Sequence, residues 1–279
     1  MSALAKDRES GRLPRIVSDI MTAPALMLDI DDRLDVASLI LEQAKIRHLP
    51  IVRDGQLRGV LSLGDVLAHA DGDPAARNTT RCHQVMTAHP LTARPGDDVI
   101  ETGRRMLRES VSCLPILNGP DGVSVVGIVT ITDFDRVGMA LLERQALVDR
   151  EPPRVATLMT SGALVTTRAE QTLDVAYAMM VSGHVHHLPV VDARERLIGV
   201  VSDHDLLRAG PERASLTVGE RMTREVVTAP ADGAAGEAAR LFEECRIGAL
   251  PVVRAGRLVG MFTETDLLAH VVSTWPLSA

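Results

Sequence analysis

The sequence predicts an α/β (α+β) protein made of four tandem repeats, each with the element order β-α-β-β-α. Three short motifs carry this prediction, because each occurs four times in the same order along 279 residues. They are a Met-Thr dipeptide (Met21, Met86, Met159, Met222), a Leu-Pro dipeptide (Leu49, Leu114, Leu188, Leu250) and a Gly-x-x-Ser/Thr-x-x-Asp motif (59–65, 127–133, 199–205, 260–266). The Leu of each repeat follows its Met by 28 or 29 residues, so the motifs keep a constant register.

Repeat 1 contains the signals for each element in order. They are a strand near Leu26–Leu28, a cap at Asp31 and Asp32, apolar residues at helical spacing from Leu34 to Ala44, a strand at His48–Val52, a turn at Asp54-Gly55, a strand at Leu57–Leu61 and a second helix opened by Ser62. Repeats 3 and 4 follow the same order. Repeat 2 has a longer hairpin loop at 118–122, which a surface turn tolerates.

The third motif predicts a strand that runs directly into a helix. Its Ser or Thr is expected at the N-cap and its Asp at the third helical position, which together form a capping box. A helix start also presents free backbone N–H groups and a positive dipole end, which suit a polar or anionic ligand. The motif therefore allows a purely structural interpretation and a ligand-binding one.

The repeats leave little chain for any other domain. We expect repeats at 17–69, 82–143, 154–208 and 216–272, with the joint between two halves at 149–154, where Pro152 and Pro153 prevent further helix. Expressed alone, residues 1–149 are expected to fold.

Composition argues against several classes of protein. Aromatic residues make up 2% of the chain and the formal net charge is −7, which disfavours a base-stacking surface and a binder of the nucleic-acid backbone. Three scattered cysteines form neither a disulfide framework nor a zinc motif. The N-terminus lacks the apolar stretch of a signal peptide, and no apolar run is long enough to span a membrane. We therefore expect a cytoplasmic protein without a membrane partner.

The series Met-Thr, Leu-Pro, Gly-x-x-Ser/Thr-x-x-Asp resembles the CBS (cystathionine β-synthase) domain, in four copies covering nearly all of residues 17–270. The resemblance implies a small mixed sheet in each repeat and pairing of the repeats into two Bateman modules, 17–143 and 154–272. The modules would stack as a disc, either within one chain or in a homodimer. It implies clefts for adenosine-type ligands (AMP, ADP, ATP or S-adenosylmethionine), and a sensor or regulator of an unknown protein target rather than an enzyme. No obligatory cofactor is implied.

The resemblance also assigns the ligand-binding residues. The ribose would be held by the Ser/Thr and Asp of each motif: Ser62 and Asp65, Thr130 and Asp133, Ser202 and Asp205, Thr263 and Asp266. Phosphate would be held by basic residues: Arg47, His48, His186, His187, His204 and Arg246. Repeats 1 and 3 are expected to bind phosphate best. The structural alternatives are that the Ser/Thr–Asp pairs only cap helices and that His48 and His187 only fill half-buried strand positions.

Two further clusters invite a metal interpretation, and neither predicts a metal site. His184 and His186 would share one face of a strand, but a closed zinc site needs about four ligands. The acidic cluster Asp29, Asp31, Asp32 and Asp35 is expected to be a cap and a solvated face.

Three functions are therefore open: a ligand-binding regulator, a structural CBS protein with degenerate clefts, and, least favoured, a metal-dependent enzyme. Two expectations follow from the leading one. Nucleotide affinity should rise from about pH 8 to 6 as the histidines gain charge. Asp203, outside the motif, should matter little for binding.

Overall fold

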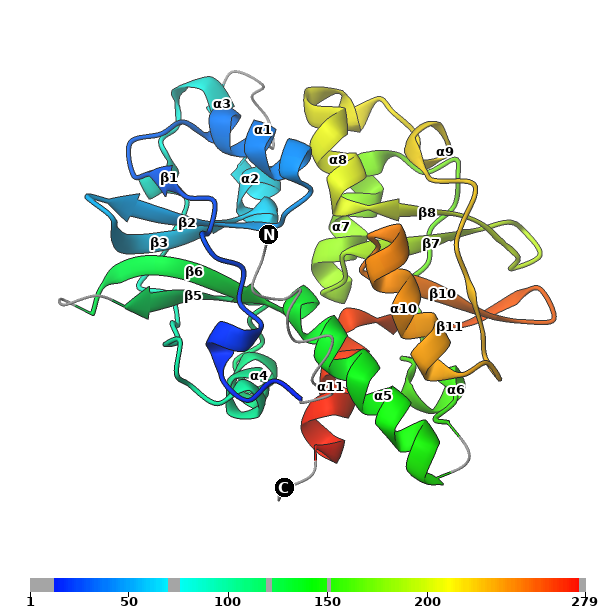
Figure 1. Ribbon diagram of the computed structural model, residues 1–279. Coiled ribbons are helices and arrows are strands. Elements are labelled where there is room, and N and C mark those ends of the chain that lie inside the picture. The colour runs from blue at the N-terminus through cyan, green and yellow to red at the C-terminus, as the bar shows by residue number, and fades with distance from the viewer. Residues whose placement is uncertain (1–12, 70–75, 119–121, 150–151, 276–279) are drawn as a thin grey trace.

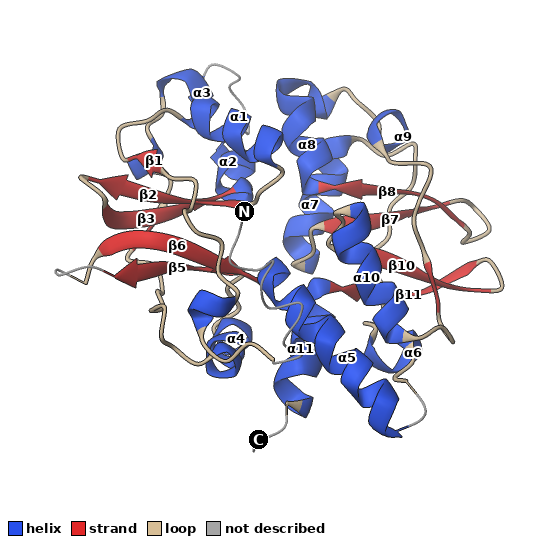
Figure 2. Cartoon of the chain, viewed as in Figure 1, coloured by secondary structure: helices blue, strands red, loops and turns tan. Residues whose placement is uncertain are grey.

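Two groups of strands lie on the outer sides of the molecule, and helices from both halves of the chain meet between them (Figure 1). The computed structural model describes residues 13–69, 76–118, 122–149 and 152–275. The β-hairpins point outward on both sides, as the cartoon coloured by secondary structure shows (Figure 2). The predicted α+β repeat order is confirmed.

Repeats 1 and 2 share one six-stranded sheet in the order β1-β2-β3-β6-β5, with β4 paired to β3. Its strands are β1 (Leu28–Asp29), β2 (His48–Arg53), β3 (Gln56–Ser62), β4 (Thr87–Ala88), β5 (Cys113–Asn118) and β6 (Ser124–Thr130). The helical segments are η3 (Val17–Asp19), α1 (Leu34–Ala44), α2 (Leu63–His69), α3 (Ala76–Thr79), η4 (Cys82–Gln84), α4 (Val99–Arg108), η5 (Ile131–Phe134) and α5 (Asp135–Asp149). We call this half of the chain the first module.

Repeats 3 and 4 form the second module in the same way. Its strands are β7 (His187–Val191), β8 (Leu197–Ser202), β9 (Ala229–Pro230), β10 (Ala249–Arg254) and β11 (Arg257–Thr263). The helical segments are α6 (Val155–Leu158), α7 (Leu173–Gly183), α8 (Asp203–Ala209), η6 (Gly210–Ala214), α9 (Val218–Arg221), α10 (Ala235–Cys245) and α11 (Glu264–Thr274). Single β-bridges, such as Arg196 to Arg257, join the two hairpins.

The methionine of each Met-Thr dipeptide packs on the motif glycine of its partner repeat, which explains why both residues recur. A Cβ atom added to Gly199 would lie 2.5 Å from Sδ of Met222, and one added to Gly260 would lie 2.4 Å from Sδ of Met159. The first module has the same two contacts, Met86 on Gly59 and Met21 on Gly127. Each repeat therefore needs its neighbour's glycine, and the predicted pairing of 1 with 2 and 3 with 4 is confirmed.

Helices join the two modules. In the first contact region α2 and α1 of repeat 1 meet α8 of repeat 3, and in the second α5 of repeat 2 meets α10 and α11 of repeat 4. One hydrophobic cluster contains buried residues of both repeat 1 and repeat 3, including Leu67 and Leu207. The side chains of Leu268 and Val271 on α11 lie in the core of repeat 2, and Leu142 on α5 lies in the core of repeat 4. Strands thus pair within a module, while apolar cores are shared between modules.

The predicted elements differ from the observed ones in two places in repeat 1. The first strand is Leu28–Asp29 rather than Leu26–Leu28. The residue before α1 is Arg33, whose side chain makes no cap hydrogen bond, so the cap predicted at Asp31 and Asp32 is wrong. Asp32 instead accepts a hydrogen bond of 2.8 Å from the backbone N–H of Asp29. The hairpin turn is as predicted, with positive φ at Asp54 and Gly55.

Two other predictions lie partly outside the described residues. The hairpin loop of repeat 2 includes 119–121, and the joint between the halves includes 150–151. The helix that precedes this joint is α5.

Candidate functional site

The Ser/Thr and Asp of each motif form the predicted capping box in all four repeats. In each repeat one carboxylate oxygen, Oδ2, accepts hydrogen bonds from both the backbone N–H and the hydroxyl of the Ser or Thr. The distances are 2.8 and 2.7 Å for Ser62–Asp65, 2.6 and 2.9 Å for Thr130–Asp133, 2.8 and 2.7 Å for Ser202–Asp205, and 2.8 and 2.6 Å for Thr263–Asp266. The structural role of the motif is confirmed, and only Oδ1 of each Asp remains for other contacts.

The contacts of Oδ1 distinguish the repeats. In repeat 2, Oδ1 of Asp133 accepts a hydrogen bond of 3.2 Å from the Thr22 hydroxyl of repeat 1. In repeat 4, Oδ1 of Asp266 accepts one of 2.8 Å from the Thr160 hydroxyl of repeat 3. The even-numbered repeats therefore use both carboxylate oxygens within the protein.

In repeat 3, Oδ1 of Asp205 has a longer contact, 3.5 Å to a guanidinium nitrogen of Arg208. A ligand hydroxyl could join this carboxylate without displacing a threonine. Arg208 also contacts Glu42 of repeat 1 at 3.5 Å. The Asp205 carboxylate is thus close to both the module junction and a cation.

One central cavity of about 2770 Å³ brings most of the predicted site residues together. It is lined by all four repeats. The predicted residues in its wall are Arg47, His48, Thr130, Asp133, His186, His187, Ser202, His204, Asp205, Arg246, Thr263 and Asp266. Ser62 and Asp65 are not in the cavity wall, so one of the four predicted ribose sites stands apart from the other three.

Arg47 connects the modules through an ion pair. Its guanidinium donates to both oxygens of Asp203, at 3.1 Å to Oδ1 and in a shorter contact to Oδ2. Nδ1 of His186 lies 3.3 Å from Oδ2 of the same carboxylate. Asp203 is buried, and although burial acts to raise its pKa, the contacts of His186 and Arg47 lower the pKa to about 2. Asp203 is therefore a buried ionic contact between the modules, and the expectation that it matters little for binding stays a prediction.

His48 and His187 lie at the cavity wall with most of each ring enclosed by protein. Nε2 of His48 lies 2.9 Å from the hydroxyl of Ser112, which links repeats 1 and 2. Burial lowers the pKa of His48 to about 3, and burial lowers that of His187 to about 4. With these pKa values both rings are neutral between pH 8 and 6. The expectation that they gain charge in that range is wrong.

The histidines of repeat 3 are not arranged as the metal interpretation requires. His184 ends α7 in the left-handed conformation, with φ of 51°, and the strand begins only at His187. His184 and His186 therefore do not share one face of a strand. His204, on α8, lines the cavity, and burial lowers its pKa.

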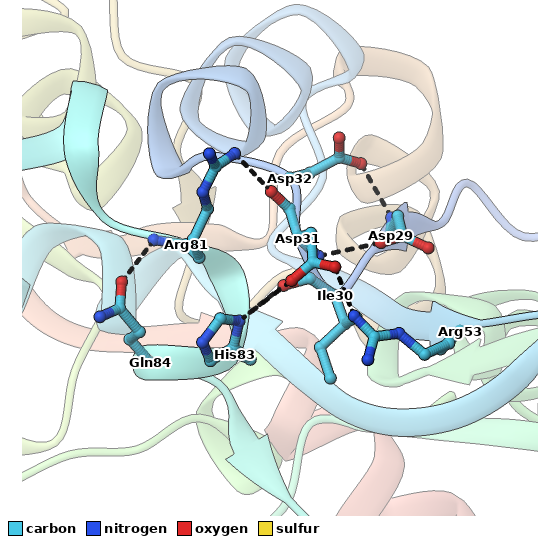
Figure 3. Close-up of polar contacts among 8 residues, drawn as sticks. All are labelled: Asp29, Ile30, Asp31, Asp32, Arg53, Arg81, His83 and Gln84. Carbon is cyan, nitrogen blue, oxygen red and sulfur yellow. Dashed lines mark hydrogen bonds and ion pairs between the residues drawn. The ribbon is translucent and has the colours of Figure 1, made fainter.

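In the acidic cluster of repeat 1, Asp29, Asp31 and Asp32 make polar contacts with one another and with neighbouring residues (Figure 3). Two of the cluster's carboxylates form ion pairs, Asp31 with Arg53 and Asp35 with Arg33. The other two accept hydrogen bonds from backbone N–H groups: Oδ1 of Asp29 from Asp31, and Oδ2 of Asp32 from Asp29. Arg81 also donates to the backbone oxygen of Asp31 at 2.7 Å. The cluster holds the chain between β1 and α1.

Sequence reasoning missed two acids at the module junctions. The residue after the motif Ser or Thr is apolar in repeats 1 and 2 but is Asp203 in repeat 3 and Glu264 in repeat 4. This difference was visible in the aligned motifs. Both acids begin helices that face the opposite module, at α8 and α11.

Comparison with known proteins identifies the family. A CBS domain model matches residues 17–72, 82–139, 155–212 and 218–273. The chain belongs to the CBS domain family. Its four CBS repeats are those seen in the fold.

Two relatives from Methanocaldococcus jannaschii match most of this CBS protein. MJ1404, an uncharacterised protein, is 27% identical over 275 residues, which cover 91% of this chain and 61% of MJ1404. The chain thus spans less than two thirds of that relative's length. MJ1225, also uncharacterised, is 24% identical over 264 residues, which cover 84% of this chain and 90% of MJ1225.

Solved structures show the same CBS fold. The crystal structure of MJ1225, described as a proposed archaeal homologue of g-AMPK, has a TM-score of 0.80 at 21% identity and covers 91% of this chain and 99% of its own. An uncharacterised conserved protein from Pyrococcus horikoshii has a TM-score of 0.65 at 22% identity, covering 92% of this chain and 100% of its own. Among the residues that the structure describes, no helix has the length and apolar character to cross a membrane.

Proposed function

We propose that this CBS protein is a non-catalytic sensor that binds an adenosine-type ligand in the central cavity and transmits its presence to a protein target. The observation that carries the proposal is that three Ser/Thr–Asp pairs, from repeats 2, 3 and 4, line one cavity with basic side chains from repeats 1, 3 and 4. Vicinal ribose hydroxyls donate well to a carboxylate, and a phosphate needs the basic groups. AMP, ADP, ATP and S-adenosylmethionine are the candidate ligands.

The Asp205 cleft is the first binding site in this proposal. Among the described residues, Oδ1 of Asp205 has a single polar contact, 3.5 Å to Arg208, so a ribose hydroxyl can approach it. His204 and Arg208 lie in the same cavity wall and would face a phosphate. Asp133 and Asp266 would bind less readily, because Thr22 and Thr160 already donate to their second oxygens.

The proposed output is a change in how the modules contact each other. The cavity is lined by both modules, here taken as 17–143 and 154–272, so a ligand within it touches both. Arg47 holds Asp203 across the same junction, and a bound phosphate would compete for that guanidinium. A protein target, or a second copy of the chain, would bind one arrangement better than the other.

A second function has a specific observation in its favour. The Thr22 and Thr160 hydrogen bonds complete the carboxylates of repeats 2 and 4 within the protein, as expected of clefts that serve assembly alone. In that case the CBS repeats would only hold the chain's surface in shape. Ligand titration separates the two functions.

The test is calorimetric titration of the full chain with adenosine, AMP, ADP, ATP and S-adenosylmethionine, with GMP as the control nucleotide. The best ligand is then measured against Asp205→Asn, which keeps the shape of the side chain and removes its charge. A hydrogen bond to a charged group contributes about 1.5–3 kcal/mol, so affinity should fall about ten- to a hundredfold. Glu225→Gln, in the same cavity wall but outside the motif, is the matched control.

Two outcomes would reject the proposal. If no adenosine ligand binds at millimolar concentration, the assembly function stands. If Asp205→Asn and Glu225→Gln bind equally well, the ribose assignment in repeat 3 fails. Both variants are measured well below their melting temperatures, since Asp205→Asn also weakens a helix cap.

A further inference from the structure

The two module junctions are built on the same positions but differ in charge. At the junction of repeats 1 and 3, the acid that begins α8, Asp203, is paired with Arg47 and contacted by His186. At the junction of repeats 2 and 4, the acid that begins α11 is Glu264. The positions equivalent to Arg47 and His186, two residues before Leu-Pro, are Ser112 and Gly248. The second junction keeps the acid and lacks the cations.

A second acidic residue lies at this junction. Asp135, the first residue of α5, is 4% exposed, and its Oδ1 has no hydrogen-bond partner among the residues that the structure describes. Its carboxyl group is hydrogen-bonded to that of Glu264, which also accepts a hydrogen bond of 3.1 Å from the Thr132 hydroxyl. All three side chains line the central cavity. A buried oxygen that lacks a partner is costly, and an ion bound at this position would offset that cost.

The neighbouring guanidinium groups are already engaged. Arg136, next in sequence to Asp135, binds Glu243 at 2.7 Å. Arg47, whose charge reaches Glu264 only through space, binds Asp203. Within the described ranges, no Lys or Arg makes an ion pair with Asp135 or Glu264.

We propose that Asp135, Glu264 and Thr132 form a divalent-cation site in the wall of the central cavity. The three groups present only oxygen atoms, which Mg²⁺ prefers, and the cation would displace the proton that the two carboxyl groups share, so that two carboxylates then balance its charge. Among the described residues no three His, Cys, Asp or Glu side chains converge on one point, so the site is open rather than closed. Mg²⁺ commonly binds through one or two carboxylates and completes its shell with water or phosphate oxygens. The cavity would supply them.

The cation site does not depend on the proposed nucleotide, and its test uses metal alone. The full chain, treated with EDTA, is titrated with Mn²⁺ and followed by electron paramagnetic resonance, and its melting temperature is measured with and without Mg²⁺. We expect one Mn²⁺ per chain, and a higher melting temperature in Mg²⁺. Asp135→Asn and Glu264→Gln should each weaken Mn²⁺ binding by at least about ten- to a hundredfold. Changes in groups that only hydrogen-bond to metal ligands already cause losses of this size.

Glu244→Gln is the matched control, because this exposed acid also lines the cavity but lies outside the pair. Its Mn²⁺ affinity should be within about twofold of that of the unmodified chain, because one exposed charge changes the electrostatics of a nearby site only slightly. Thr132→Val is the second variant should either carboxyl substitution fail to fold, and it too should weaken binding. Unchanged Mn²⁺ affinity in these variants would overturn the proposal, and so would equal losses in Glu244→Gln. Stabilisation by an organic ammonium ion but not by Mg²⁺ would also overturn it.

Discussion

Arg47 at the end of the loop before β2 binds both carboxylate oxygens of Asp203, the first residue of α8, across the junction of repeats 1 and 3. This pair is the polar counterpart of the apolar cluster that the two repeats share. Because Asp203 is buried and Arg47 lies beside the cavity, the pair links the stability of the junction to the contents of the cavity.

Removing this buried carboxylate should destabilise the protein. Asp203→Ala leaves the guanidinium of Arg47 without its partner in a half-buried position, and we expect a loss of about 2–4 kcal/mol in the free energy of unfolding. Urea unfolding of the full chain measures it. The matched control is Asp35→Ala, which breaks the exposed pair with Arg33 and should cost at most about 1 kcal/mol. Equal losses in the two variants would show that the buried pair with Arg47 stabilises the protein no more than an exposed ion pair does.

The contribution of His48 and His187 to stability should fall as the pH falls from about 6.5 to 4. The pKa values of His48 and His187 in the folded protein, about 3 and about 4, lie below the ordinary value of 6.5. The unfolded chain therefore binds more protons in this window, and each histidine contributes a slope of at most about 1.4 kcal/mol per pH unit. Above pH 7 both contributions are complete. Urea unfolding at a series of pH values measures the slope.

That experiment compares the pH slope of the unmodified chain with the pH slope of the His48→Asn variant. Burial, with the nearby Glu264, raises the pKa of Asp135 to about 10, so Asp135 contributes with the opposite sign over the same window. The difference between the two proteins cancels this contribution. A slope that is the same with and without His48 would mean that the ring takes up protons in the folded protein over the same pH range as in the unfolded chain.

Much of the local structure follows from the repeated motifs, and the reason is physical. A capping box and the packing of a methionine on a glycine are short-range or strictly periodic, so four aligned copies predict them. The charge state of His48 and the partner of Asp203 depend on how the modules pack, which no single repeat encodes. The aligned motifs did contain one usable signal, an acid after the Ser or Thr in repeats 3 and 4 only. The role of these acids becomes clear only from the residues of the opposite module that lie next to them.

The motif glycine should not tolerate a side chain. In Gly199→Ala the new Cβ would lie 2.5 Å from Sδ of Met222 and 3.1 Å from the backbone oxygen of Thr223, so the paired repeat must move. We expect a loss of about 1–3 kcal/mol in the free energy of unfolding, typical of overpacking. Thermal or urea unfolding measures it. Gly96→Ala, where nothing lies within 4 Å of the added Cβ, is the control and should be neutral or slightly stabilising.

The threonine across the repeat 4 cleft should limit ligand access to Asp266. Thr160→Val has the same shape and removes the hydroxyl that donates to Oδ1, which then becomes available to a ribose hydroxyl. If the nucleotide proposal holds, calorimetry should show either an added binding site or an affinity raised by about three- to tenfold. The gain corresponds to about 1 kcal/mol, because the ribose hydroxyl no longer competes with Thr160 for the carboxylate oxygen. Thr160→Ser keeps the hydroxyl and should bind like the unmodified chain. Identical isotherms for the Val and Ser variants would rule out this gating role.

The exchange of apolar side chains between modules has a consequence for how the chain can be divided. Leu268 and Val271, near the C-terminus, complete the core of repeat 2, and Leu142 from the first half completes that of repeat 4. A cut at the joint between the halves would leave each fragment with an incomplete interior, so residues 1–149 alone should be a poorer folding unit than their two repeats suggest. Calorimetry of the full chain should then show a single heat-absorption peak, and two separately expressed halves should regain that peak only when they are mixed. The smallest part of the chain that should fold independently is therefore the full set of four repeats.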